Sequence, residues 1–294
     1  FFHDRVNDSF ESINLRKSGN DWGNSFFRDG LVSEIAKGMN IDRLAYQPSV
    51  VYLNGEYWGM LNLREKPTQH YLEENYGVDK SKVNILENNG DVIEGNASDY
   101  TKLRNFIGSE SLSEKENYEY VSTKMDIDCF IDYQIPEIYI HNGDWPGNNI
   151  KFWNTSSGYG KYRWIIFDTD FGFDLYYNAS QINSMEFATD ENGHDWPNPP
   201  WSTLLLRKLL NNDEFRISFI NRFMDCLNTN LSAEVFNDKV DSISYIIDSE
   251  VYNHTQRWGN TSYDSWLYEV ERIKNFNIDR NYTMREYIKS YFGL

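Results

Sequence analysis

The hydrophobic pattern of the first part of the chain predicts a strand, a helix and then a β-hairpin. Residues 13–15 form a short apolar strand, and helical spacing of apolar side chains predicts a helix over residues 28–39, with Asn40 as its stop. Residues 50–53 and 57–63 are rich in β-branched and aromatic side chains and flank an Asn-Gly pair, a strong hairpin signal. Pro67 is expected to end the pairing of the second hairpin strand.

The later part of the chain carries helical spacing. Asp126 is a predicted N-cap for a helix through about residue 140, and Pro136 is expected to kink or break that helix. From Trp201 to the end the pattern is helical, and three phenylalanines four residues apart are expected to share one buried helix face: Phe215, Phe219 and Phe223. Residues 71–120 are polar, with loops and a helix near residues 100–107. Residues 193–200 form a Pro-rich, lid-like segment.

These elements predict an α+β fold with a strand-rich N-terminal part and a helix-rich C-terminal part. The two parts correspond approximately to residues 1–120 and residues 121–294. The chain contains no Pro- or Ser-rich linker, so the two parts are expected to be closely joined lobes of a single domain.

Composition narrows the functional classes. Hydrophobic residues make up 40% of the 294 residues, enough for a sizeable core. The net charge of −17, without clusters of Lys and Arg, argues against nucleic acid and suits a basic protein substrate. Apolar runs are too short for a membrane span. Cys129 and Cys226 lie in apolar helical patterns and are expected to be reduced core thiols, with a disulfide as the alternative that the sequence leaves open. Phe1 to Asp4 suggest a chain cut from a longer precursor.

Two acidic segments stand at the ends of a second predicted hairpin. Asp144 lies in a Gly/Pro-flanked loop that precedes an apolar run, a polar turn and another apolar run ending at Phe167. Antiparallel strands joined by a tight turn start and finish side by side, so Asp168 and Asp170 should return to the Asp144 loop. Protein-kinase-type phosphoryl transfer uses this arrangement, with an aspartate facing the substrate hydroxyl and an asparagine five residues later at a metal.

The asparagines and the acidic pair are candidate metal ligands. Strand alternation would place Asn148 and Asn149 on opposite faces, so that one of them faces the metal, and the five-residue offset favours Asn149. Asp168 and Asp170 lie two positions apart at a strand end, and a divalent cation would relieve their repulsion. Mg²⁺ commonly takes one or two carboxylates together with phosphate oxygens. We expect Asp168 to be at least as important as Asp170.

A nucleotide would also need positive charge. The cations near element ends in the first part are Arg16, Arg28, Arg64 and Lys66, and Glu65 could orient the neighbouring lysine or bind metal. The sequence has no standard glycine-rich phosphate loop, no metal-type histidine spacing and no serine hydrolase elbow. Paired carboxylates with 9 Trp and 21 Tyr would suit a glycosidase cleft, but that mechanism has no role for the asparagine or the hairpin spacing.

Several motifs resemble the spore-coat CotH family of atypical protein-kinase-like enzymes. The residues that carry the resemblance are Leu15-Arg16, Ser18-Gly19-Asn20, Leu53-Asn54-Gly55-Glu56-Tyr57-Trp58-Gly59, Asn62-Leu63-Arg64-Glu65-Lys66, Asn142-Gly143-Asp144-Trp145, Asn148-Asn149, Phe167-Asp168-Thr169-Asp170-Phe171-Gly172 and the segment with Glu250, His254 and Arg257. The match covers roughly residues 11–290. Trp145-Pro146-Gly147 departs from the family as a stiffer loop.

The resemblance implies a bilobal kinase-like fold that uses ATP and Mg²⁺ to phosphorylate Ser/Thr of proteins, on spores, at the cell surface or outside the cell. By position, Asp144 would take the catalytic-loop role, Asn149 a metal role, and Asp168 with Asp170 the acidic pair at the metal. A second hypothesis is a non-catalytic surface module that binds polysaccharide or protein and keeps a divalent-metal site, with Ca²⁺ as a further option.

Overall fold

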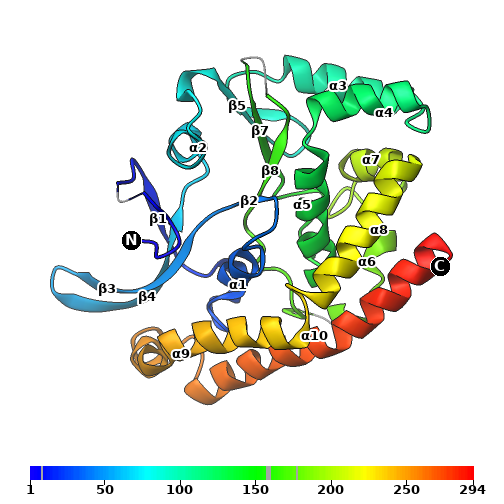
Figure 1. Ribbon diagram of the computed structural model, residues 1–294. Coiled ribbons are helices and arrows are strands. Elements are labelled where there is room, and N and C mark those ends of the chain that lie inside the picture. Colours follow the sequence, from blue (N-terminus) through cyan, green and yellow to red (C-terminus); the bar gives the residue numbers. More distant parts are fainter. Residues whose placement is uncertain (8, 157–159, 177) are drawn as a thin grey trace.

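A computed structural model describes residues 1–7, 9–156, 160–176 and 178–294 of the chain. The fold is α+β, with a strand-rich N-terminal part and a helical C-terminal part, as the sequence predicted, and it is consistent with a bilobal kinase-like architecture (Figure 1). Two sheets occupy the upper and left regions of Figure 1, and two long helices run along the base.

The first sheet has three antiparallel strands in the order β1-β4-β3, formed by β1 (Ile13–Arg16), β3 (Tyr46–Leu53) and β4 (Glu56–Glu65). The predicted Asn-Gly hairpin is confirmed, since Asn54 and Gly55 both adopt positive φ angles, 51° and 84°, as a tight hairpin turn requires. Strand β4 ends before Pro67. The register sets Arg16 opposite Asn62, so the ends of β1 and β4 bring two arginines, Arg16 and Arg64, to one region.

The second sheet has the order β2-β8-β7-β5-β6 and joins strands from both halves of the sequence. Its members are β2 (Asp42–Arg43), β5 (Val83–Glu87), β6 (Asp91–Glu94), β7 (Lys151–Thr155) and β8 (Arg163–Ile166). Strands β7 and β8 pair antiparallel with Lys151 opposite Ile165, which confirms the second predicted hairpin. The prediction of a polar, loop-rich stretch over residues 71–120 was incomplete, because β5 and β6 lie there and β5 is buried between neighbours.

The N-terminal helices differ from their predicted bounds in places. Helix α1 (Arg28–Ile35) is shorter than predicted, because the chain leaves the helix at Ala36 and Gly38 takes a φ of 83°. The other helical elements of this region are η1 (Gly19–Asp21), α2 (Gln69–Tyr76), η2 (Lys80–Lys82), α3 (Ser98–Ser109) and α4 (Lys115–Lys124). The sequence anticipated α3 and missed α2 and α4.

Helix α5 (Ile127–Ile140) leads the chain into the Asp144 loop. The Asp126 side chain accepts a hydrogen bond from the Cys129 backbone N–H, which confirms the predicted N-cap. Of the kink or break expected at Pro136, the break is wrong, because α5 continues through this residue to Ile140. A proline removes one helical hydrogen bond, but residues 129–140 are all buried, and this packing holds the helix together.

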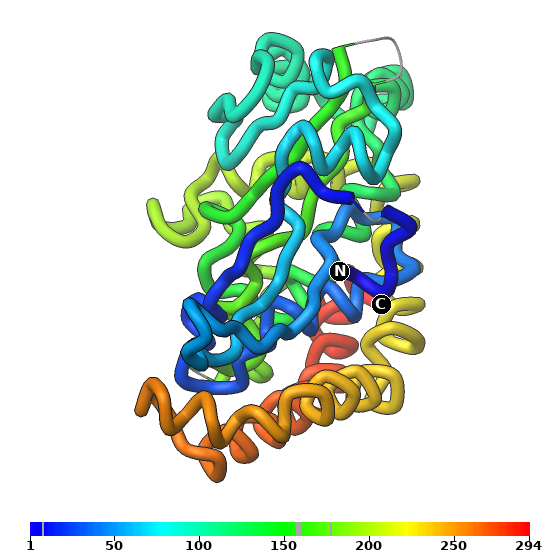
Figure 2. Tube along the Cα trace, turned by 90° about the vertical axis from the view of Figure 1, so that its left-hand side faces the viewer, coloured from blue at the N-terminus to red at the C-terminus, as the bar shows by residue number. Residues whose placement is uncertain are grey.

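The helical C-terminal part is confirmed. It consists of η3 (Ala179–Gln181), α6 (Ser184–Ala188), α7 (Pro200–Leu209), α8 (Asp213–Asn228), α9 (Ala233–Trp258) and α10 (Tyr263–Phe292). Helices α9 and α10 lie side by side along the base in both views (Figure 2). The three phenylalanines of α8 are fully buried along one face, as predicted. None of the helices in the described residues is long and apolar enough to cross a membrane.

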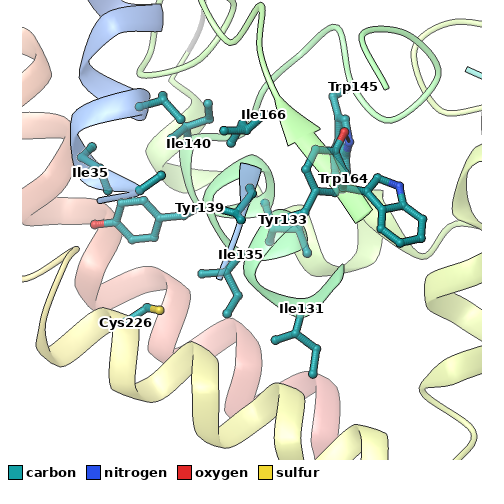
Figure 3. Close-up of a cluster of buried hydrophobic side chains, with 14 of the residues drawn as sticks. Ile35, Ile131, Tyr133, Ile135, Tyr139, Ile140, Trp145, Trp164, Ile166 and Cys226 are labelled. Carbon is teal, nitrogen blue, oxygen red and sulfur yellow. Dashed lines mark hydrogen bonds between the residues drawn. The ribbon is translucent and has the colours of Figure 1, made fainter. Parts of the chain in front are cut away.

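The main hydrophobic core surrounds α5. Figure 3 shows Tyr133, Ile135 and Tyr139 of this helix among side chains from α1, β8 and α8. Both cysteines are free and buried, in agreement with the prediction of core thiols. The same core extends from α1 to α10, so α5 and the loop that follows it rest on a continuous packed base.

Candidate active site

The carboxylate of Asp144 is held from two sides in the loop after α5. Asn148 Nδ2 and Asn149 Nδ2 donate to Asp144 Oδ2 at 3.2 and 3.0 Å, and Trp196 Nε1 donates to Asp144 Oδ1 at 2.7 Å. Asn142 supports the loop from below, because its Oδ1 accepts from the Asp144 backbone N–H at 3.3 Å. The orientation of Asp144 is therefore set by three donors before any ligand binds.

The predicted opposite orientation of Asn148 and Asn149 was wrong. Both amides point at Asp144, because strand alternation does not apply at these positions: β7 begins only at Lys151, and Asn149 has a φ of 58°. Asn149 Nδ2 also donates to the Asp168 carbonyl oxygen at 3.4 Å. This asparagine thus connects the two loops at the ends of the β7–β8 hairpin.

The acidic pair after β8 surrounds the side chain of Arg16. Arg16 Nη2 forms an ion pair with Asp168 Oδ1 and another with Asp170 Oδ2, the latter at 2.9 Å. Asn20 donates to Asp170 from its backbone N–H and from its side chain, at 3.3 and 3.1 Å. Gly19 is required at this contact, because a Cβ there would lie 1.8 Å from Asp170 Oδ2.

Asp29 of α1 joins this cluster, although it was not among the candidate site residues of the sequence analysis. Its carboxylate forms an ion pair with Arg64 Nη2 at 3.1 Å and approaches Arg16 Nη1 at 3.8 Å. Thr169, between the paired aspartates, donates to Asp29 from both its backbone N–H and its hydroxyl, each at 3.2 Å. Asp29 therefore ties the first sheet to the loop after β8.

Two of the predicted cofactor-binding residues lie in other networks. Arg28 is fully buried and forms ion pairs with Asp21 and with Glu269 of α10, the second at 2.6 Å. Glu65 is also buried and accepts from Arg5 at 2.5 Å and from the Ala45 backbone N–H at 2.7 Å. The structure brings neither side chain to the Asp168–Asp170 cluster.

Lys66, a predicted phosphate-binding residue, is exposed just beyond β4. Its positive charge helps to lower the pKa of a second lysine, Lys151. Lys151 Nζ lies over the ring of Phe167, 4.7 Å from its centroid. Burial lowers the pKa of Lys151, and the charges of Glu87 and Asp168 oppose this effect. Lys151 Nζ forms an ion pair with Glu87 Oε2 at 3.8 Å and also feels the charge of Asp168.

The pKa values of the site reflect crowded negative charge. Burial raises the pKa of Asp170 to about 7, the charge of Asp168 adds to this effect, and Arg16 opposes it. Glu137, on α5 below the loop, is fully buried, and burial raises its pKa to about 8, with contributions from the charges of Asp29, Asp168 and Asp144. Burial alone would raise the pKa of Asp29 as well, but Arg64 and Arg16 hold it below its ordinary value.

The donor set fits a metal only together with a ligand that supplies further oxygens. Among the described residues there is no group of three or more His, Cys, Asp or Glu that could hold a metal ion. Asp168 and Asp170 nevertheless share one guanidinium nitrogen. Mg²⁺ needs only one or two carboxylates when phosphate oxygens complete its octahedron. Three aspartates, Asp29, Asp168 and Asp170, contact two arginines, Arg16 and Arg64, so the carboxylates in these ion pairs outnumber the guanidinium groups by one.

Comparison with known proteins identifies the family of this chain. No curated protein matches the chain. The family model described as CotH kinase protein matches residues 2–284, which covers nearly the whole chain and includes every residue of the cluster around Asp144 and Asp168. This chain therefore belongs to the CotH kinase protein family.

Proposed function

We propose that this protein is an ATP- and Mg²⁺-dependent kinase that transfers the γ-phosphate of ATP to Ser or Thr of secreted or surface proteins. The observation that carries the proposal is the bridge made by Asn149, whose Nδ2 donates to Asp144 Oδ2 and to the Asp168 carbonyl oxygen. This bridge sets a carboxylate that could accept a hydroxyl proton beside a pair of carboxylates that could hold a metal. Kinase-type phosphoryl transfer needs both groups at one phosphate.

In the proposed reaction the acceptor hydroxyl oxygen forms a bond to the γ-phosphorus of ATP, the bond to the β–γ bridging oxygen breaks, and ADP leaves. Asp144 orients the hydroxyl and takes its proton. Mg²⁺ would neutralise charge on the phosphates. The residues available to hold it are Asp168, Asp170 and the amide oxygen of Asn149, with Asn148 as the neighbouring amide.

We assign the positive charge for the phosphates to Arg16 and Arg64, with Lys66 just beyond β4 and Lys151 on β7 of the second sheet. Arg16 forms ion pairs with Asp168 and Asp170. We expect Arg16 to exchange these ion pairs for a phosphate oxygen when the nucleotide binds, because a guanidinium pairs with phosphate as well as with carboxylate. Arg64 remains close through its ion pair with Asp29.

The expected substrate is a basic or Ser/Thr-rich protein in an extracellular, cell-surface or spore-coat assembly. The net charge of −17 supports this choice, since an acidic surface attracts basic partners and repels nucleic acid. The family match supports a kinase-like activity in general.

The test measures transfer of labelled γ-phosphate from ATP to a basic, Ser/Thr-rich protein in the presence of Mg²⁺. Asp144→Asn keeps the shape of the side chain but removes the base, and we expect the rate to fall by about 10² to 10⁴. Asp168→Asn is expected to abolish the increase in melting temperature that ATP and Mg²⁺ cause together. The matched control is Asp99→Asn on α3, where the carboxylate is 70% exposed and pairs only with a neighbouring lysine among the described residues.

Two outcomes would contradict the proposal. One is the absence of a melting-temperature shift with ATP and Mg²⁺ in the wild type, with Asp168→Asn behaving identically. The other is phosphate transfer that survives Asp144→Asn at the wild-type rate. The first result would favour the non-catalytic surface module, in which the same carboxylates would bind a divalent cation such as Ca²⁺ without nucleotide. The second would show that Asp144 is not the base.

A further inference from the structure

Trp196 contacts the proposed base from a segment that lies outside both acidic loops. It belongs to residues 193–199, between α6 and α7, and its side chain is 56% exposed. Despite this exposure, its indole N–H does not point into open solvent but donates to Asp144 Oδ1 at 2.7 Å. An exposed aromatic ring is thereby aligned with the one carboxylate that the proposed reaction uses as a base.

The segment that carries Trp196 is fastened to the Asp144 loop by its backbone. The Gly147 N–H donates to the Pro197 carbonyl oxygen, and a Cβ on Gly147 would lie 2.4 Å from that oxygen, so the backbones of the two segments are in direct contact. On the other side, Asn198 Nδ2 donates to the Phe187 carbonyl oxygen at 3.1 Å. These contacts fix Trp196 relative to Asp144 independently of the indole hydrogen bond.

The hydrogen bonds to Asp144 leave a defined place for the acceptor hydroxyl. A carboxylate offers about four lone-pair positions, two on each oxygen. Asn148 and Asn149 occupy both positions on Oδ2, and Trp196 occupies one on Oδ1. The remaining position is on Oδ1, so a hydroxyl bound there lies beside the indole ring.

Further aromatic side chains extend this surface. The ring of Phe171 lies 6.3 Å from that of Trp196 and 4.8 Å from that of Tyr176, measured between centroids. Tyr176 is 55% exposed. The three rings therefore form a continuous aromatic wall from the Asp144 loop to the acidic pair, on the side where the acceptor hydroxyl would bind.

We propose that Trp196 is a positioning residue for phosphate transfer, which acts through Asp144, and that Trp196, Phe171 and Tyr176 form the wall against which the acceptor peptide lies. The inference rests on the proposed function, since it assigns the acceptor side of that same site. The N–H orients the Asp144 carboxylate, and the ring contacts the peptide backbone and side chains next to the accepted hydroxyl.

Two substitutions separate these roles. Trp196→Phe removes the N–H and keeps an aromatic ring, so kcat is expected to fall roughly tenfold, which corresponds to one hydrogen bond to a charged group, while KM for the acceptor stays within about twofold. Trp196→Ala removes the ring as well and is expected to raise KM for the acceptor by roughly tenfold in addition. The KM for ATP and the melting-temperature shift with ATP and Mg²⁺ should not change in either variant.

The matched control is Trp258→Phe. Trp258 is also partly exposed, and its Nε1 donates to the Trp58 carbonyl oxygen at 2.8 Å, at the end of α9 beside the β3–β4 hairpin. The Trp258→Phe variant should retain the wild-type kcat and KM. Unchanged kinetics in Trp196→Phe, or an equal loss in Trp258→Phe, would overturn the assignment. If wild-type protein transfers no phosphate to any acceptor, the proposed function itself fails, and the two failures are thus distinct. Should Trp196→Ala not fold, Trp196→Leu, which also removes the aromatic ring, takes its place in the KM measurement.

Discussion

The carboxyl group of Glu137 should make the protein less stable as the pH rises, and its replacement should remove this effect. Glu137 is fully buried in α5; its Oε2 accepts from Asn142 Nδ2 at 2.9 Å, and its Oε1 has no hydrogen-bond partner among the described residues. Burial raises its pKa from 4.5 to about 8, helped by three nearby aspartates: Asp29, Asp168 and Asp144. The folded state therefore holds a proton that the unfolded state releases near pH 4.5.

Proton linkage sets the sign and size of the change in the free energy of unfolding with pH. Since the pKa of Glu137 is raised in the folded state, its contribution is intact below pH 4.5 and is lost as the pH rises towards about 8. Within this window each pH unit lowers the free energy of unfolding by about 1.4 kcal/mol. Between pH 5 and pH 7 the loss from this one group is on the order of 3 kcal/mol.

Glu137→Gln provides the test, because glutamine is nearly the same size, stays neutral and can still accept from Asn142. Melting temperatures of the wild type and the variant are compared from pH 5 to pH 8. The two should nearly coincide at pH 5, and the variant should melt roughly 5–10 °C higher at pH 7 and above. The raised pKa of Asp170 is present in both proteins, so its own pH dependence largely cancels in the difference.

Glu116→Gln on α4 is the matched control, since Glu116 is exposed and the substitution should leave the melting temperature unchanged at every pH. A constant difference between Glu137→Gln and the wild type across this range would refute the reasoning. So would a wild type that gains stability relative to the variant as the pH rises.

Two further substitutions test the structure away from the Asp144 loop. Arg28→Met should lower the free energy of unfolding by roughly 3–5 kcal/mol in urea titrations, because it leaves the buried carboxylates of Asp21 and Glu269 without their ion-pair partner; a loss below about 1 kcal/mol would contradict this account. Gly59→Ala places a Cβ 2.8 Å from both His254 Nδ1 and Trp258 Nε1 and should lower the free energy of unfolding by about 3 kcal/mol. In Gly55→Ala the new Cβ meets no atom, so the free energy of unfolding should fall only by the roughly 1–2 kcal/mol that a positive φ costs. Equal losses in thermal unfolding would show that contact with α9 does not restrict Gly59.

The sequence alone determined the features that depend on neighbouring residues. The Asn54-Gly55 turn, the N-cap at Asp126 and the phenylalanine stripe of α8 were all predictable, because turn geometry, capping and helical periodicity are set within a few positions. The approach of Asp168 to the Asp144 loop was predictable for the same reason, since it requires only one hairpin between them.

The local signal failed where burial decides structure. Residues 83–87 form a strand in a polar-looking region because β5 pairs on one side with β6 and on the other with β7, which follows more than sixty residues later. Pro136 remains inside α5 because the surrounding core compensates for the lost hydrogen bond. Neither outcome can be recognised in a window of ten residues.

The partners of the charged and aromatic residues were decided by the tertiary structure alone. Arg16 and Arg28 look equivalent in the sequence, yet one reaches Asp168 and Asp170 across 152 and 154 positions and the other is buried against α10. Trp196 reaches Asp144 across 52 positions. Local periodicity specifies which residues form an element and which face is apolar, but the contacts of a long side chain depend on how the elements pack. The β7–β8 hairpin could therefore be predicted from the sequence, whereas the contacts of the arginines and of the Trp196 indole around it could not.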